Sequence, residues 1–203
     1  GVGTSALDAA ICGWRCYRQA AYAEAIKVWA AIGATGASWL DAWIALGIAK
    51  VATDCGRWGS ALGWCAIASA LARGGEHLDH LAAAAGARGE ILMRAGFPRA
   101  AAQAFAEDLA MLPPGARYAG RIRCYRAHAW ARLGTGAERA AEIAYRLAAH
   151  SPGERSDPFA IAGLALLGAR QKNVGLVRSL RGGDPGTLAG MPAAWLEVAA
   201  IRV

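Results

Sequence analysis

The sequence WLDAWIALGIAKVATD fills residues 39–54 and predicts a long helix that is apolar along most of its length. Cys55-Gly56 follows it directly, and glycine readily adopts the left-handed conformation in which a helix ends and the chain reverses. Residues 58–72 then carry a second apolar helical pattern. This stretch therefore predicts a helical hairpin, two helices joined by a short glycine-containing turn.

Helical hairpins recur along most of the chain. One predicted pair precedes residues 39–72 and two follow, and they are 6–18 with 22–32, 78–95 with 98–112, and 118–133 with 137–150. Gly96 and Gly134 stand at turns where the chain must reverse. We expect a further helix at 158–171 and a short one at 193–201 that closes the array.

The composition agrees with closely packed helices. Of the 203 residues, 56% are apolar and 18% are charged, the opposite balance from a disordered chain. Alanine, the best helix former, dominates, whereas the β-branched residues that favour strands are sparse. The longest uncharged run, residues 58–72, is shorter than the roughly 20 apolar residues that a membrane-spanning helix needs. We therefore expect one domain or one repeat array, with no membrane span.

The second helix of each pair carries a small residue and, one helical turn later, a partner residue. The small residues are Ala25, Ala61, Ala101 and Ala140, at intervals of 36, 40 and 39 residues. The residues four positions later are Trp29, Cys65, Phe105 and Ala144. We expect the small side chain to let the paired helix approach, and the larger ones to fill the gap between hairpins.

This pattern resembles the tetratricopeptide repeat (TPR). Trp43, Leu46 and Gly47 reproduce the W-x-x-L-G opening of that family, and Ala61 matches the small residue of its second helix. The matching positions in the other pairs are Gly13, Tyr22, Ala25 and Trp29, then Gly89, Gly96, Ala101 and Phe105, and finally Gly134, Ala140 and Pro152. The resemblance covers residues 6–152, with intervals longer than the family's repeat of about 34 residues.

The resemblance implies an all-α fold, a right-handed α-solenoid of about four TPR-like hairpins with a helical C-terminal cap. We expect residues 6–203 to form one repeat domain, with residues 1–5 outside it. In the TPR family the first helix of each pair lines a concave surface that binds a protein or peptide. On that surface the resemblance places Trp14, Tyr17, Ile44, Ile48, Val51, Glu90, Met93 and Arg94. An exposed apolar groove is a docking site for a peptide or helix, unless a capping helix or a dimer partner covers it.

A basic stretch occupies residues 117–132, with five arginines and no acidic residue. The residues that fall close to one face of its predicted helix are Arg121, Tyr125, His128 and Arg132. Guanidinium groups bind carboxylates bidentately, so this face predicts a clamp for acidic groups of a partner. The net charge of +7 favours an acidic peptide, a nucleic acid or an anionic surface. A solvated basic face and a nucleic-acid surface are the alternatives.

The five cysteines are odd in number and match no disulfide framework. Most lie inside apolar helical patterns, so we expect buried free thiols in a reducing compartment and a cytoplasmic protein. Cys12 and Cys16 are four residues apart, whereas metal sites usually use Cys-x-x-Cys. His77 and His80 open a helix whose acidic neighbours suit its N-terminus. We therefore expect no metal and no cofactor.

The predicted function is a protein- or peptide-binding scaffold or adaptor whose groove is apolar at one end and basic at the other. The stretch YAEAIKVW, residues 22–29, and the helix after it are similar in layout to secretion chaperones built from three TPRs, which hold an unfolded client segment. TPR-like arrays also follow DNA-binding domains in bacterial transcription regulators, and a chain that does not begin with Met leaves room for one. An enzyme would need a pocket with convergent polar groups, and no such constellation stands out in the sequence.

Overall fold

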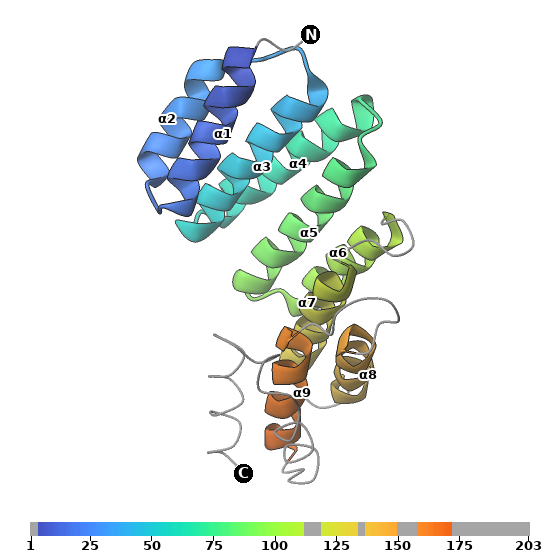
Figure 1. Ribbon diagram of the computed structural model, residues 1–203. Coiled ribbons are helices and arrows are strands. Elements are labelled where there is room, and N and C mark those ends of the chain that lie inside the picture. Colours follow the sequence, from blue (N-terminus) through green and yellow to red (C-terminus); the bar gives the residue numbers. More distant parts are fainter. Residues whose placement is uncertain (1–3, 112–118, 134–136, 150–157, 172–203) are drawn as a thin grey trace. The chain divides into compact units, whose positions relative to one another are not determined.

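The computed structural model describes residues 4–111, 119–133, 137–149 and 158–171, and every regular element within these ranges is an α-helix (Figure 1). The helices are α1 (Thr4–Arg18), α2 (Tyr22–Ile32), α3 (Ser38–Asp54), α4 (Trp58–Gly74), α5 (Leu78–Arg94), α6 (Pro98–Met111), α7 (Ala119–Arg132), α8 (Glu138–Ala149) and α9 (Pro158–Arg170). Each begins and ends within two residues of its prediction, and the predicted helix at 193–201 lies outside the described residues. None of these helices is long and apolar enough to cross a lipid bilayer.

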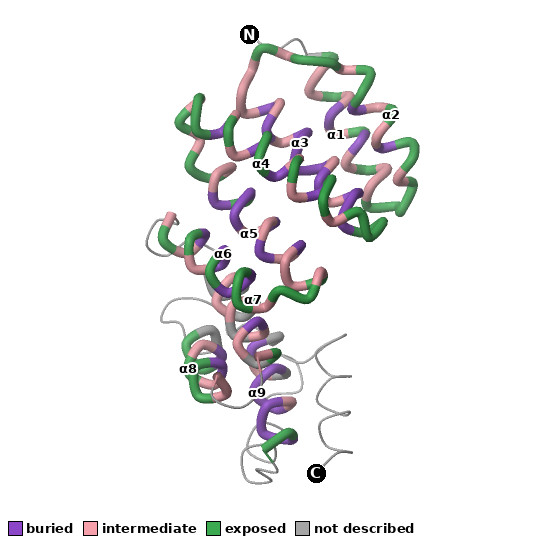
Figure 2. The backbone as a smooth tube through the Cα atoms, turned by 180° about the vertical axis from the view of Figure 1, so that it is seen from behind, coloured by how far each residue is buried: buried purple, intermediate pink, exposed green. Residues whose placement is uncertain are grey.

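The chain divides into two compact units, and helices α1 to α5 belong to the first. In this unit α1 packs against α2, α3 against α4, and α4 against α5. The first helices of successive pairs also contact one another, because α3 packs against α1 and against α5. Figure 2 shows that buried residues recur along most of α3, as expected for a helix with neighbours on several sides.

The core of the first unit forms where small residues on one helix face large residues on another. The indole of Trp29 is buried against the backbone of Gly13 in α1 and of Gly47 in α3, and its Nε1 donates a hydrogen bond to the Ala10 carbonyl oxygen at 3.2 Å. Around it lie the buried side chains of Leu40, Ile44 and Val51. A second cluster joins α3, α4 and α5 through alanines, Leu46, Cys65 and Ile91.

Helices α7, α8 and α9 of the second unit pack against one another in every pairing. Their shared core contains Tyr145 of α8 and Leu164 and Leu167 of α9, with Trp130 of α7 packed against it. Helix α6 belongs to the same unit over residues 98–109, and its Phe105 ring contacts the ring of Tyr125 in α7 at 5.7 Å between centroids.

The second helix of each pair was predicted to pack through a small residue and a partner residue four positions later. Burial at both positions is confirmed in three of these helices, and the predicted positions are wrong in the fourth. The alanines at 25, 61 and 101 are fully buried, and so are the side chains four positions later in α2, α4 and α6. In α8, however, Ala140 is exposed, and the buried pair is Ala141 with Tyr145. Burying a tyrosine ring removes far more apolar surface from water than burying Ala144, which explains the one-residue change. The interval from 101 to 141 is then 40 residues, equal to that from 61 to 101.

The prediction that the cysteines are buried is correct for Cys65 alone among those whose side chains are described. Cys12 and Cys55 are exposed and Cys16 is partly buried, all as free thiols. Cys12 belongs to a helix whose buried positions are Ala10 and Gly13, so it lies on another face. Cys55 caps the C-terminus of α3, where the chain turns away from the core.

Candidate functional site

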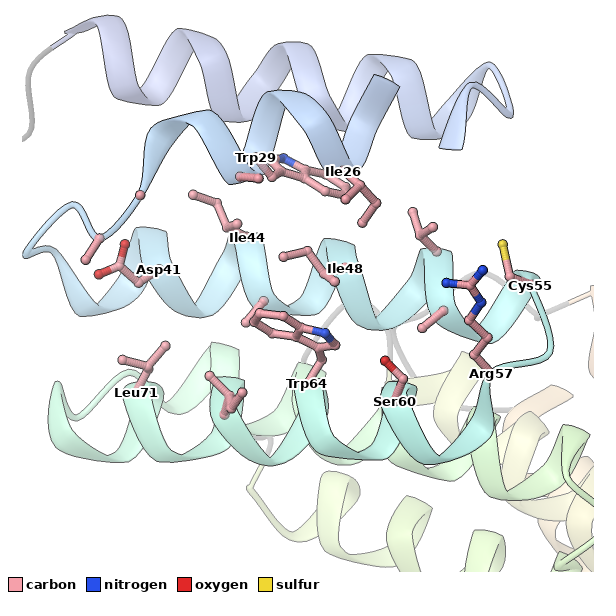
Figure 3. Close-up of a pocket in the computed structure, with 17 residues that line it drawn as sticks. Ile26, Trp29, Asp41, Ile44, Ile48, Cys55, Arg57, Ser60, Trp64 and Leu71 are labelled. Carbon is pink, nitrogen blue, oxygen red and sulfur yellow. The ribbon is translucent and has the colours of Figure 1, made fainter. Parts of the chain in front are cut away.

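A groove of about 570 Å³ lies between α2, α3 and α4 in the first unit (Figure 3). Its floor is made by buried side chains of α3, among them Ile44 and Val51. Partly buried apolar side chains line its walls, namely Ile26, Ile48, Trp64 and Leu71. Ile67 on the α4 wall is 45% exposed. The groove therefore presents a continuous apolar surface that is open to solvent.

The spacing of residues along two helices explains why the groove is apolar. Along α3, the residues at 41, 44, 48, 51 and 55 follow steps of three and four, which place them on one face. Along α4, Trp64, Ile67 and Leu71 form a bulky stripe with the same steps. The small residues at 61, 65, 68 and 72 form a neighbouring stripe that is buried in the core. Because its small stripe packs inward, α4 leaves its bulky stripe facing the groove.

The two ends of the groove carry opposite charges. Asp41 lies at one end, where its Oδ1 accepts hydrogen bonds from the backbone N–H of Thr35 at 3.0 Å and from the Thr35 hydroxyl at 2.8 Å. Arg57 lies at the other end beside Cys55, just before α4 begins (Figure 3). The end at which α3 begins is therefore acidic, and the end at which α3 finishes is basic.

A different face of the first unit carries a polar network that joins α1, α3 and α5. Asp54 is its centre, because it accepts a hydrogen bond from the Tyr17 hydroxyl at 2.9 Å and pairs with Nη1 of Arg94 at 2.7 Å. Nη2 of Arg94 also lies 2.9 Å from a carboxylate oxygen of Glu90, and Lys50 lies 3.7 Å from that carboxylate group. Burial, and then the hydrogen bond to Asp54, raise the pKa of the Tyr17 phenol well above its usual range. The two cations and two carboxylates balance, so this face is polar but neutral in sum.

The residues predicted for the concave surface lie in three different environments. Ile44 and Ile48 line the groove, together with Val51. Tyr17, Glu90 and Arg94 belong instead to the polar network. Trp14 is partly buried in an aromatic cluster, where it stacks on Trp43 with the ring centroids 5.6 Å apart. Their role in binding a partner stays a prediction.

The residues predicted for the basic face lie in the second unit. Tyr125 is exposed beside Phe105, and Arg132 is exposed near the end of α7. His128 is partly buried, and its Nδ1 lies 2.6 Å from the Tyr145 hydroxyl. The side chain of Arg121 lies outside the described residues. Of the three side chains described, His128 is thus partly buried, whereas Tyr125 and Arg132 are exposed.

Sequence reasoning missed most of the groove's walls, although it included Ile48. Ile26, Arg57, Trp64, Ile67 and Leu71 all line it, and none was predicted to bind. The spacing of the bulky residues of α4 is a usable signal, since it separates them from the alanine stripe. Within the part of the chain that the structure describes, no three His, Cys, Asp or Glu side chains cluster as metal ligands would. His77 instead lies 3.0 Å from the Ser38 hydroxyl, and its ring contacts that of His80.

Comparisons with known protein families, with characterised proteins and with solved structures gave no match to this chain. The function is therefore argued from the geometry of the groove.

Proposed function

We propose that this chain is a protein-binding module of TPR-like helical hairpins, and that it holds an apolar segment of a partner in the groove between α2, α3 and α4. The observation that carries the proposal is the bulky stripe of α4, with Ile67 nearly half exposed on the wall of an open apolar groove. Covering such surface lowers the free energy of the system by about 25 cal/mol for each Å² of apolar area removed from water. Exposed apolar grooves of this kind mark binding sites for peptides and helices.

An amphipathic helix that runs parallel to α3 is the occupant that suits the groove best. The acidic end at Asp41 would face the positive N-terminal end of such a helix, and Arg57 would face its negative C-terminal end. From position 41 to position 55, α3 rises by about 21 Å, the length of a helix of about 14 residues. We therefore expect a partner segment of roughly four helical turns with one apolar face.

The TPR-like arrangement is part of the same proposal. It is supported by the pairing of α1 with α2 and of α3 with α4, and by the contacts of α3 with both α1 and α5. The equal intervals of 40 residues between positions 61, 101 and 141 also support it. We further propose a cytoplasmic location, because the exposed free thiols of Cys12 and Cys55 suit a reducing compartment.

Site-specific crosslinking in the native host tests the groove. A photo-crosslinking amino acid placed at Ile67 should form a discrete adduct with a partner protein. The same amino acid at Leu78, which is also exposed and apolar but lies outside the groove, is the matched control. The Ile48→Glu substitution should abolish the adduct at position 67, because it places a charge on the apolar wall.

The chemistry of the crosslinked partner segment decides the result. Mass spectrometry should locate it in an apolar or amphipathic stretch of helical periodicity. Equal adducts from positions 67 and 78, an adduct that survives Ile48→Glu, or a purely polar crosslinked segment would each overturn the proposal. Circular dichroism of the Ile48→Glu protein establishes that a lost adduct does not come from a lost fold.

A further inference from the structure

Three hydrogen-bond donors gather toward the basic end of the groove between α2, α3 and α4. They are the guanidinium of Arg57, the hydroxyl of Ser60 and the indole N–H of Trp64, all on residues that line the groove. Steps of three and four residues place them on the same face of α4 as Ile67 and Leu71. Figure 3 shows the Ser60 hydroxyl and the indole nitrogen of Trp64 between the apolar middle of the groove and Arg57.

The guanidinium of Arg57 is not used within the described part of the chain. An arginine near the end of a helix often caps the last carbonyl groups of that helix. Here the backbone N–H groups of residues 55, 56 and 57 already donate to carbonyl oxygens in the last turn of α3, at 2.8–3.0 Å. The Arg57 side chain also forms no ion pair with any described residue, whereas Arg94 pairs with Asp54. Arg57 is exposed, so its charge is open to a partner.

The two neutral donors also lack an acceptor among the described residues. Within a helix a serine hydroxyl can donate to the carbonyl oxygen four residues earlier, as Ser69 does to Cys65 at 2.9 Å. Ser60 lies in the first turn of α4, and the residue four positions earlier is Gly56, which belongs to the turn before the helix. Trp64 is only partly buried, and no described acceptor meets its indole nitrogen. Both groups therefore face the occupant of the groove.

This set of donors complements the end of an α-helix. The last four carbonyl groups of a helix have no partner within that helix, and together they carry about half a negative charge. A mixture of one cationic and two neutral donors suits several partly charged oxygens on successive residues. A cluster of acidic side chains would instead be matched by a cluster of cations.

We propose that Arg57, Ser60 and Trp64 cap the C-terminal turn of the partner helix, so that the bound helix ends at the basic end of the groove. The inference rests on the function proposed above. It adds the residues that fix the direction of the bound helix and the place where that helix stops.

Photo-crosslinking from both ends of the groove in the native host tests this direction and this end. Cys55 lines the basic end, Leu71 lies on the wall at the opposite end, and α4 rises by about 21 Å from residue 57 to residue 71. In one partner segment the two adducts should lie roughly 10–14 residues apart, because a helix rises by about 1.5 Å per residue. The Cys55 adduct should be the C-terminal one and lie in the last turn of the helical stretch. An extended segment would cover the same distance with about six residues.

The adducts separate this inference from the function on which it rests. If Ile67, Cys55 and Leu71 all fail to give an adduct, both are wrong. An adduct from Ile67 without one from Cys55 overturns the capping alone. So does a Cys55 adduct that lies N-terminal to the Leu71 adduct, a spacing of about six residues, or a helical pattern that continues for more than two turns past the Cys55 adduct.

Substitutions that each remove one donor test the capping itself. The probe is a synthetic peptide of the crosslinked segment with an amidated C-terminus, which excludes any contribution from a terminal carboxylate. Arg57→Gln, Ser60→Ala and Trp64→Phe should each weaken its binding about 3- to 10-fold in calorimetry, as expected for the loss of one hydrogen bond. Arg15→Gln makes the same charge change at an exposed residue of α1 outside the groove, and it should leave the affinity unchanged.

A second peptide, in which glutamine replaces every acidic residue, distinguishes the helix end from an acidic side chain. Capping of carbonyl groups predicts that both peptides bind the parent protein about equally and that Arg57→Gln weakens both. If the second peptide binds the parent as weakly as the first binds Arg57→Gln, then Arg57 pairs with an acidic side chain and the capping is wrong. Parent-like affinity in the Arg57→Gln and Ser60→Ala proteins would overturn it as well.

Discussion

The indole of Trp29 occupies the space in which a side chain at Gly47 would stand. A Cβ atom built at Gly47 would lie 2.5 Å from Cη2 and 2.6 Å from Cζ2 of that indole. The same indole contacts Gly13 and donates a hydrogen bond to the carbonyl oxygen of Ala10, so one aromatic side chain joins α1, α2 and α3. The glycine of the W-x-x-L-G motif in α3 is thus required by a tryptophan of the preceding hairpin.

We predict that Gly47→Ala destabilises the protein. The added methyl group would overpack a filled core and should lower the free energy of unfolding by about 1–3 kcal/mol. The gain in helix propensity, at most about 1 kcal/mol, offsets only part of this loss. Urea unfolding followed by circular dichroism measures the difference.

Gly63→Ala on α4 is the matched control. Gly63 is exposed in the middle of its helix, and nothing lies within 4 Å of the place where its Cβ would stand. This variant should be more stable than the parent by up to about 1 kcal/mol, because alanine is the better helix former. If the two variants are destabilised equally, close packing against Trp29 is not the reason that position 47 requires glycine.

We predict a measurable coupling between Asp54 and Arg94, which lie on different helices 2.7 Å apart. The Asp54 side chain is 21% exposed and that of Arg94 is 46% exposed, so solvent weakens their attraction. A double-mutant cycle of Asp54→Asn and Arg94→Met should give a coupling free energy of about 0.5–1 kcal/mol that declines with added salt.

The exposed pair Glu24 and Lys27 provides the comparison, since it lies within one helix at 3.8 Å and both side chains are well solvated. A double-mutant cycle on this pair should give a coupling free energy close to zero. If the coupling between Asp54 and Arg94 is no larger than this, the polar network around Asp54 does not hold α3 and α5 together.

We predict that stability depends on the protonation of Asp108 in α6. This carboxyl is 1% exposed, and no hydrogen bond from the described residues reaches its Oδ1. Burial raises its pKa to about 7, whereas the pKa of an aspartate in the unfolded chain is about 3.9. The folded state therefore keeps a proton that the unfolded state releases, and the protein should lose stability as the pH rises from about 4 to 7.

Asp108→Asn replaces the acid by a neutral group of nearly equal shape and should remove this pH dependence. Relative to the parent, the variant should gain stability between pH 4 and 7, by up to about 4 kcal/mol. Asp8→Asn, at an exposed position of α1, makes the same change in charge without the burial. Urea unfolding at several pH values provides the test, and a stability difference that stays constant with pH would contradict the prediction.

Local sequence features predict the helices well because the turns are marked by glycine and the helices by alanine-rich apolar runs. They do not predict the buried positions of α8 correctly, since Ala140 and Ala141 are equally small and only packing shows that the ring of Tyr145 is buried. They also miss the wall that α4 contributes to the groove. Whether Ile67 faces a neighbouring helix or solvent depends on where α2 lies, which no local pattern contains.

The last prediction concerns Gly163, which lies against the ring of Tyr145 as Gly47 lies against Trp29. Gly163→Ala should push this buried ring away from α9 and weaken the packing of α7, α8 and α9, at a cost of about 1–3 kcal/mol. Hydrogen exchange should then accelerate in peptides from these three helices and stay unchanged in peptides from α1 to α5. Tyr145→Phe keeps the ring but removes its contact with His128, so it should cost only about 0.5–1.5 kcal/mol. Equal acceleration along the whole chain in Gly163→Ala would show that the two units do not open separately, and no acceleration would show that the ring has room to move.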